Sequence, residues 1–135
     1  MSIQVLVDAD NVDTTRVAAV LSALLAAVPP GDLRMTVAGR SAAIEATEWP
    51  SYAEVVVAAG WQRADLVLAA AYVPDDRPLV LVSGDGDFGL LVTRHPGPAL
   101  VVSEAASYRL REGVTVVDPA IDGPDALHRW LDAVS

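Results

Sequence analysis

The sequence predicts an α/β fold, a three-layer α/β/α sandwich with a mostly parallel central sheet. Short apolar runs that are typical of strands alternate with helical segments along the chain. The strand runs are almost purely apolar, the pattern of strands covered on both faces, rather than alternating apolar and polar. The 135 residues match the size of one domain. We therefore expect a single domain, residues 1–135, with right-handed crossovers.

Six strands are expected from these apolar runs. The first begins at Ile3, is broken only by Gln4, and stops at Asp8, as a buried strand does when it delivers a polar residue to its carboxyl end. The predicted strands are Ile3–Val7, Arg34–Ala38, Glu54–Ala58, Leu79–Val82, Ala99–Val102 and Val114–Val117.

Helices are expected between the strands. Thr14 or Thr15 could cap the first, which continues to Val28 and is ended by Pro29, Pro30 and Gly31. Ser41 could cap the second. The remaining predicted helices are Ser41–Glu48, Ala64–Tyr72, Phe88–Thr93, Glu104–Arg111 and Pro124–Val134.

Composition restricts the possible functions. The chain has no cysteine, which excludes disulfides and thiolate metal sites and leaves carboxylates and histidine as ligands. The formal net charge is −9 and all nine cations are arginine, which weighs against strong binding of nucleic acid through a broad basic surface. An acidic chain that binds nucleic acid needs a local arginine patch or bound metal.

The apolar segments also bear on location and assembly. The longest, Val17–Val28, is shorter than the roughly 20 residues that cross a bilayer. With no secretory pattern at the amino terminus, we expect a cytoplasmic protein that does not enter membranes. The apolar fraction of 53% suggests that some surface is covered by a second copy in a homodimer.

Two acidic clusters follow strands of the predicted sheet. Asp8, Asp10 and Asn11 follow the first strand, and Asp85 and Asp87 follow the fourth. Because the carboxyl ends of parallel strands share one edge, we expect the clusters to meet there. Grouped carboxylates repel one another unless a cation or proton neutralises them, and all-oxygen sites suit Mg²⁺ or Mn²⁺. Such ions activate water for phosphodiester cleavage.

A purely structural interpretation stays open for each cluster, because aspartate and glycine commonly cap helices and shape turns. Asp10 could line the site or cap the first helix. Ser83 could orient Asp85, touch a phosphate, or serve as an ordinary turn hydroxyl. The two histidines, His95 and His128, have no spacing partner for metal binding.

The residues also resemble the NYN domain family of the PIN-like nuclease superfamily. The similarity lies in Val5-Leu-Val-Asp8-Ala-Asp-Asn11, in Ala64-Asp65-Leu-Val-Leu-Ala69, and most specifically in Val82-Ser-Gly-Asp85-Gly-Asp87-Phe88. A weaker match at Ser103–Leu110 extends it over most of the chain.

This resemblance implies a PIN-like fold and a Mg²⁺- or Mn²⁺-dependent ribonuclease, with single-stranded RNA as the expected substrate. It implies that the catalytic, metal-binding acids are Asp8, Asp65, Asp85 and Asp87. Asn11 would brace Asp8 or touch the substrate, and the other candidate substrate contacts are Ser83, Arg40 and Arg63. Asp65 lies near the start of a helix, where the helix dipole alone also favours an acid.

The chain departs from the family pattern at two positions. A lysine often found before the helical aspartate is replaced by Gln62 or Arg63, and an acid about two turns later is replaced by the Ala70-Ala71 region. Guanidinium does not simply substitute for ammonium. These changes, with the acidic charge, keep open a non-catalytic module that binds RNA or a protein.

Another enzyme class is a second alternative. Asp8-Ala-Asp10 after a buried strand also resembles the nucleophile motif of haloacid-dehalogenase-type phosphatases. That family usually needs a lysine or arginine behind the nucleophile, and here only an arginine could serve. Asp65 and the Asp85-Gly-Asp87 pattern fit the nuclease better.

Overall fold

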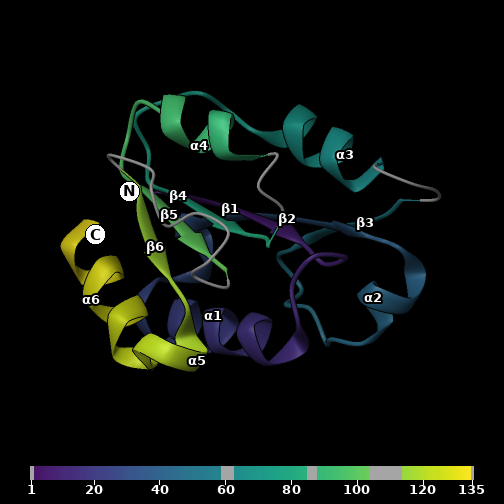
Figure 1. Ribbon diagram of the computed structural model, residues 1–135, viewed down its shortest axis with the longest axis horizontal. Helices are drawn as coiled ribbons and strands as arrows, with labels where there is room; N and C mark the ends of the chain where they lie inside the picture. Colours follow the sequence, from purple (N-terminus) through teal and green to yellow (C-terminus); the bar gives the residue numbers. More distant parts are fainter. Residues whose placement is uncertain (1, 59–62, 85–87, 104–113, 135) are drawn as a thin grey trace.

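All six strands run parallel in one sheet, in the order β3-β2-β1-β4-β5-β6 (Figure 1). The structure is a computed structural model that describes residues 2–58, 63–84, 88–103 and 114–134. The strands are β1 (Ile3–Asp8), β2 (Leu33–Gly39), β3 (Glu54–Val57), β4 (Leu79–Val82), β5 (Ala99–Val102) and β6 (Thr115–Val117).

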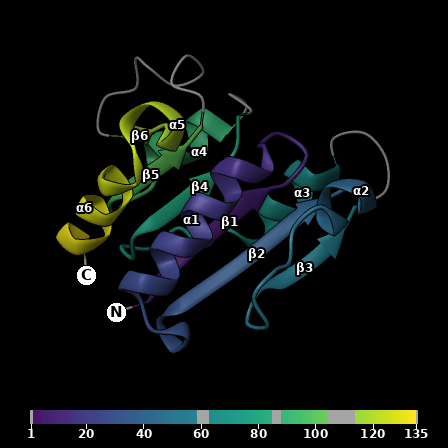
Figure 2. The ribbon, with the colours of Figure 1, turned by 90° about the horizontal axis from the view of Figure 1, so that it is seen from below.

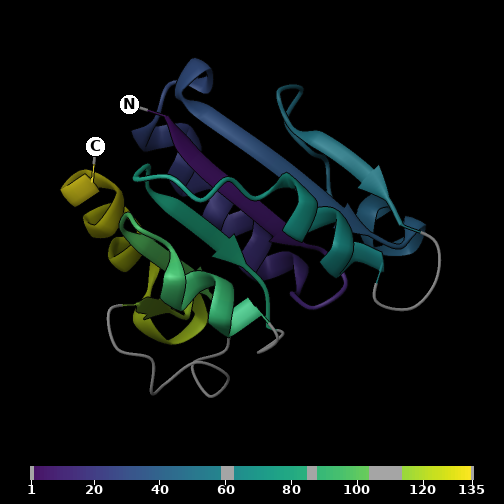
Figure 3. The same cartoon turned by 90° about the horizontal axis from the view of Figure 1, so that it is seen from above.

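Helices cover both faces of the sheet, which makes three layers (Figures 1 and 2). The lower layer in Figure 1 contains α1 (Thr14–Ala27), α2 (Ser41–Glu45), α5 (Pro119–Asp122) and α6 (Pro124–Val134). The upper layer contains α3 (Arg63–Ala71) and α4 (Gly89–Arg94), seen from above in Figure 3. A short 3-10 helix, η1 (Pro30–Asp32), leads into β2. The predicted three-layer α/β/α class is confirmed.

Alternation along the strands divides the core into two apolar layers. Val5 and Val7 of β1 pack with α1 and α6, whereas Leu6 between them packs with Leu68 of α3 on the other face. Successive side chains of a strand point to opposite faces, so a continuous apolar run supplies both layers. This is why the strand segments contain little polar sequence.

The predicted strands agree with the structure to within one residue at each end. The predicted helix at Glu104–Arg111 lies outside the described residues. Two short helices, η1 and α5, were not predicted, because each is a single turn that begins at a proline and has little periodicity. None of the described helices is long and apolar enough to span a membrane.

The predicted helix caps were wrong. Asp13 caps α1 by accepting a hydrogen bond from the backbone N–H of Arg16, whereas Thr14 is the first helical residue. Ser41 is likewise the first residue of α2, whose cap position is Arg40, and the helix ends at Glu45 rather than Glu48. In α1 a carboxylate one residue upstream takes the capping role that was expected of a threonine hydroxyl.

Candidate functional site

The candidate site lies at the carboxyl edge of the sheet, where the strand order reverses. β1 pairs with β2 on one side and with β4 on the other, so the loops after β1 and β4 leave the sheet toward different helices. Open parallel sheets bind ligands in the crevice at such a reversal. Asp8 ends β1 and Ser83 directly follows β4, which places both at this point.

Asp8 is fully buried and is held by two neutral donors. The side-chain amide of Asn11 donates to Oδ2 of Asp8 at 2.8 Å, and the hydroxyl of Ser83 donates to the same oxygen at 3.0 Å. Among the described residues, Oδ1 of Asp8 is buried without a hydrogen-bond partner. A buried polar atom without a partner is costly, so this oxygen is where a further donor or a cation would be most stabilising.

The surroundings of Asp8 favour its protonated form. Burial raises the pKa of the Asp8 carboxyl above its ordinary value, the hydrogen bonds from Asn11 and Ser83 lower it in part, and the charge of Asp10 raises it further. The net direction is upward. A bound cation would act in the opposite direction, since it stabilises the charged carboxylate.

A close backbone contact joins the two loops that carry Asn11 and Ser83. The N–H of Gly84 donates to the carbonyl oxygen of Asn11 at 2.7 Å. A Cβ atom on Gly84 would lie 2.7 Å from that oxygen, a distance that real Cβ atoms essentially never show. Glycine is therefore required where the loops after β1 and β4 meet, and their contact holds both donors of Asp8 together.

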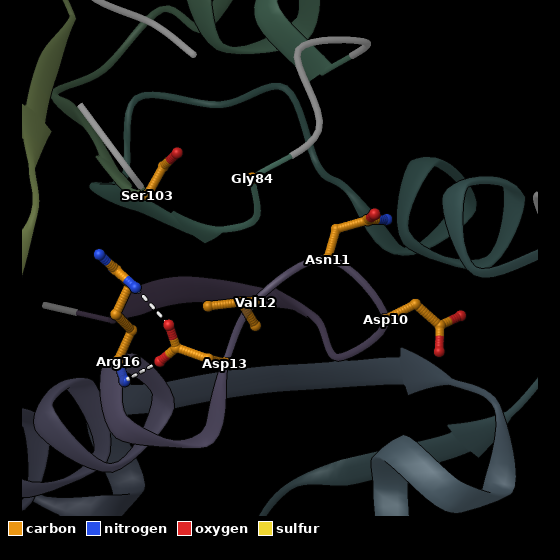
Figure 4. A pocket seen from close by; sticks show the side chains of 7 residues that line it. All are labelled: Asp10, Asn11, Val12, Asp13, Arg16, Gly84 and Ser103. Carbon is orange, nitrogen blue, oxygen red and sulfur yellow. Dashed lines mark hydrogen bonds and ion pairs between the residues drawn. The ribbon is translucent and has the colours of Figure 1, made fainter. Parts of the chain in front are cut away.

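A solvent-accessible cleft of about 440 Å³ opens beside this contact (Figure 4). In Figure 4, Asp13 and Arg16 face each other on one side of the cleft, and Asp10 points away from them. The lining residues follow β1, β4 and β5, and are Asp10, Asn11, Val12, Asp13, Arg16, Gly84 and Ser103.

Arg16 is the cation in the lining of this cleft, and two carboxylates hold it. Its guanidinium contacts Asp13 and makes two hydrogen bonds with Asp118, from Nε at 3.0 Å and from Nη2 at 3.1 Å. The bond to Asp118 is the main cause that raises the pKa of Arg16. Asp118 follows β6, is almost completely buried, and caps α5 through the N–H of Ala120. The pair therefore joins the start of α1 to the start of α5.

Of the two roles expected for Asp10, capping the first helix is excluded, because Asp13 is the cap of α1. The carboxylate of Asp10 lines the cleft and accepts a hydrogen bond at 3.0 Å from the backbone N–H of Arg40, the cap position of α2. The guanidinium of Arg40 lies 3.7 Å from the same carboxylate and is 66% exposed. Arg40 is thus on the predicted edge of the sheet, beside an acid and open to solvent.

The other predicted acids are only partly described. Asp65 lies in the first turn of α3, which follows β3 and so begins at the carboxyl edge. Arg63 is the first residue of that helix. Asp85 and Asp87 lie outside the described residues. Within the described ranges there is no group of three or more acids or histidines spaced to hold a metal ion.

Five site residues were not predicted: Asp13, Arg16, Gly84, Ser103 and Asp118. Asp13 precedes Thr14 and carries an ordinary signal for a helix cap that could have been found. Arg16 and Asp118 are 102 positions apart, and no local pattern relates them. The contact of Ser83 with Asp8 was not predicted either, because Ser83 is two positions from Asp85, the acid that it was expected to orient.

No protein-family model and no curated protein sequence matches this chain. A crystal structure of a protein of unknown function from Vibrio parahaemolyticus is similar in fold, with a TM-score of 0.52 and 20% sequence identity. The alignment covers 87% of this chain and 93% of that chain. The likeness supports the α/β fold over nearly the whole length.

Proposed function

We propose that this protein is a divalent-metal-dependent nuclease that hydrolyses phosphodiester bonds of RNA, with Asp8 at the centre of its site. The observation that carries the proposal is the buried Oδ1 of Asp8, which has no hydrogen-bond partner among the described residues. It lies at the reversal of strand order, next to an open cleft. The residues that carry the NYN resemblance supply the further acids.

The donor set around Asp8 fits a hard cation. Oδ2 is already occupied by Asn11 and Ser83, which fix the plane of the carboxylate and leave Oδ1 for a ligand. Mg²⁺ and Mn²⁺ prefer carboxylate oxygens, and ligating carboxylates are usually held by outer hydrogen bonds of this kind. The upward shift in the pKa of Asp8 means that ion binding would displace a proton or relieve a buried charge.

The proposed ligands are Asp8, Asp65, Asp85 and Asp87, with Asn11 and Ser83 as the residues that orient Asp8. When bound, the metal would lower the pKa of a coordinated water and neutralise charge that develops on the phosphate. Arg40 directly precedes α2, and Arg63 is the first residue of α3 at the same edge. Both would contact the backbone of RNA. The proposed metal ligands and the proposed RNA contacts thus all belong to the carboxyl edge of one sheet.

The test is cleavage of labelled single-stranded RNA with added Mn²⁺ or Mg²⁺ and with EDTA. Asp8→Asn should reduce the metal-dependent rate by at least roughly 100-fold, because it removes a ligand charge at an unchanged shape. Asp132→Asn is the matched control, since it removes the same charge from an exposed position on α6 and should cleave like the wild type. Circular dichroism of both variants confirms that they are folded.

Other outcomes point to the alternatives. Absence of RNA and DNA cleavage, with RNA still bound, would contradict the nuclease and support the non-catalytic module. Hydrolysis of p-nitrophenyl phosphate that depends on Asp8, without cleavage of RNA, would support the phosphatase alternative instead.

A further inference from the structure

Helices α3 and α4 lie on the face of the sheet opposite α1 (Figure 3), and residues of both helices line an apolar groove of about 500 Å³. The groove is separate from the cleft beside Asp8, whose lining comes from other residues. The groove has charged residues at its ends and apolar residues along its length, namely Leu66, Ala69, Tyr72, Phe88, Leu90 and Leu91.

Two leucines of this groove project into solvent. Leu66 of α3 is 71% exposed and Leu90 of α4 is 60% exposed. A single exposed leucine is ordinary on a protein surface, but two leucines at the borders of one apolar groove form a continuous apolar surface. Phe88, which is buried, lies in the same lining and supplies an apolar base against which a leucine can pack.

The charged residues lie at opposite ends of the groove. Each helix follows a strand of the parallel sheet, so both begin at its carboxyl edge and run toward the amino edge. Asp65 lies in the first turn of α3, near the carboxyl edge. Arg94 is the last residue of α4, near the amino edge. The surface therefore carries an acid at one end and a base at the other.

We infer that this face pairs with a second copy of the chain about a two-fold axis. In an isologous interface, residue i of one copy contacts residue j of the other, and j contacts i. An antiparallel arrangement of two grooves sets Arg94 of each copy against Asp65 of the other. It also packs the leucines at one end of each groove against the apolar residues at the other end of the groove of the second copy. The charge pattern thus complements itself.

The dimer has a consequence for the site, which rests on the proposed function. Asp65 is one of the proposed metal ligands, and the second copy brings a guanidinium to it. Carboxylates that bind metal are commonly held by such outer partners, and an arginine beside RNA adds attraction for phosphate. Arg94 of the second copy would then lie beside Asp65 and add a cation next to the proposed site of a chain that is acidic overall.

The first test is the mass of the purified protein by sedimentation equilibrium, without metal or RNA. We expect a dimer, and we expect Leu66→Glu to raise its dissociation constant at least tenfold by placing a charge in the apolar interface. Leu25→Glu is the matched control, because Leu25 is 73% exposed on α1, across the sheet, and its substitution should leave the dissociation constant unchanged. A monomer at up to roughly 100 µM, or equal effects of the two substitutions, would overturn the inference.

A charge exchange tests the orientation. Arg94→Asp alone and Asp65→Arg alone should each weaken the dimer, because each sets like charges together, and the double substitution should restore it. A double variant that associates no better than the weaker single variant would exclude the antiparallel pairing. Association is measured without metal or RNA, so a monomer would overturn the dimer and say nothing about RNA cleavage. Absence of cleavage would likewise leave the dimer untouched.

Discussion

Burial of Asp8 penalises its charged form, and the hydrogen bonds from Asn11 and Ser83 offset only part of that penalty, since its pKa is shifted upward. The proposed function gives this cost a purpose. Groups that bind metal or perform catalysis are held in arrangements that lower stability when the ligand is absent. The cost can be measured without knowing the substrate.

Asp8→Asn should make the metal-free protein more stable at neutral pH. The pKa of Asp8 in the folded state lies above its ordinary value of 3.8. Ionisation therefore lowers the free energy of unfolding as pH rises from 3.8 through the raised pKa, and the loss remains at pH 7. We expect the variant to exceed the wild type by more than the ~0.5 kcal/mol typical of neutral substitutions. The gain should disappear below roughly pH 4. Urea unfolding in EDTA at both pH values measures this, and a variant that is less stable at pH 7 would contradict it.

Helices α1 and α5 are linked through side chains that also shape the cleft. Arg16 in the first turn of α1 binds Asp118, which in turn caps α5 and is 2% exposed. A buried carboxylate that loses its cation is left uncompensated, whereas an exposed ion pair contributes little. We therefore expect the Arg16–Asp118 pair to contribute much more to the free energy of unfolding than the Arg40–Asp10 pair.

Arg16→Leu should lower the free energy of unfolding by about 3 kcal/mol, because Asp118 keeps its burial and loses its guanidinium. Arg40→Leu removes a pair at 3.7 Å with a 66% exposed arginine and should cost less than about 1 kcal/mol. Chemical denaturation of both variants at pH 7 compares them directly. Equal losses would show that the Arg16–Asp118 pair does not stabilise the junction between α1 and α5.

The molecule as a whole carries nine more acidic than basic side chains. RNA attracted by a broad basic surface would bind with a steep dependence on salt, because each phosphate contact releases counterions. Such a surface is hard to build from nine arginines, of which Arg16 is already held by two acids. Bound metal and a few arginines at one edge are a more economical source of affinity.

We therefore expect RNA binding to need Mn²⁺ or Mg²⁺ and to depend weakly on monovalent salt. A plot of log K against log salt concentration should have a slope of magnitude below about 3, as for few phosphate contacts. Fluorescence anisotropy with a non-cleavable RNA analogue, with the metal present or chelated, gives the slope. A steep slope that persists in EDTA would show instead that the chain binds RNA through cations alone.

The position of Asp8 at the edge was predictable from local sequence, because an apolar run that ends in aspartate identifies a buried strand and its carboxyl end. The hydrogen bonds that hold Asp8 were less predictable from local sequence. Asn11 is three residues away and was expected as a brace, whereas Ser83 is 75 residues away and reaches Asp8 only because β4 lies next to β1. The cap of α1 was misassigned because threonine and aspartate carry the same local signal.

Local sequence was enough to predict the type and order of the strands and every described helix except η1 and α5, since periodicity and turn residues act within a few positions of one another. Only the tertiary structure decided which strands are neighbours, and hence that the loops after β1 and β4 meet at Gly84 and that Arg16 finds Asp118. It also placed Leu66 and Leu90 on either side of one groove. The physical reason is that these contacts depend on the packing of helices against a sheet, which joins residues that no local pattern relates.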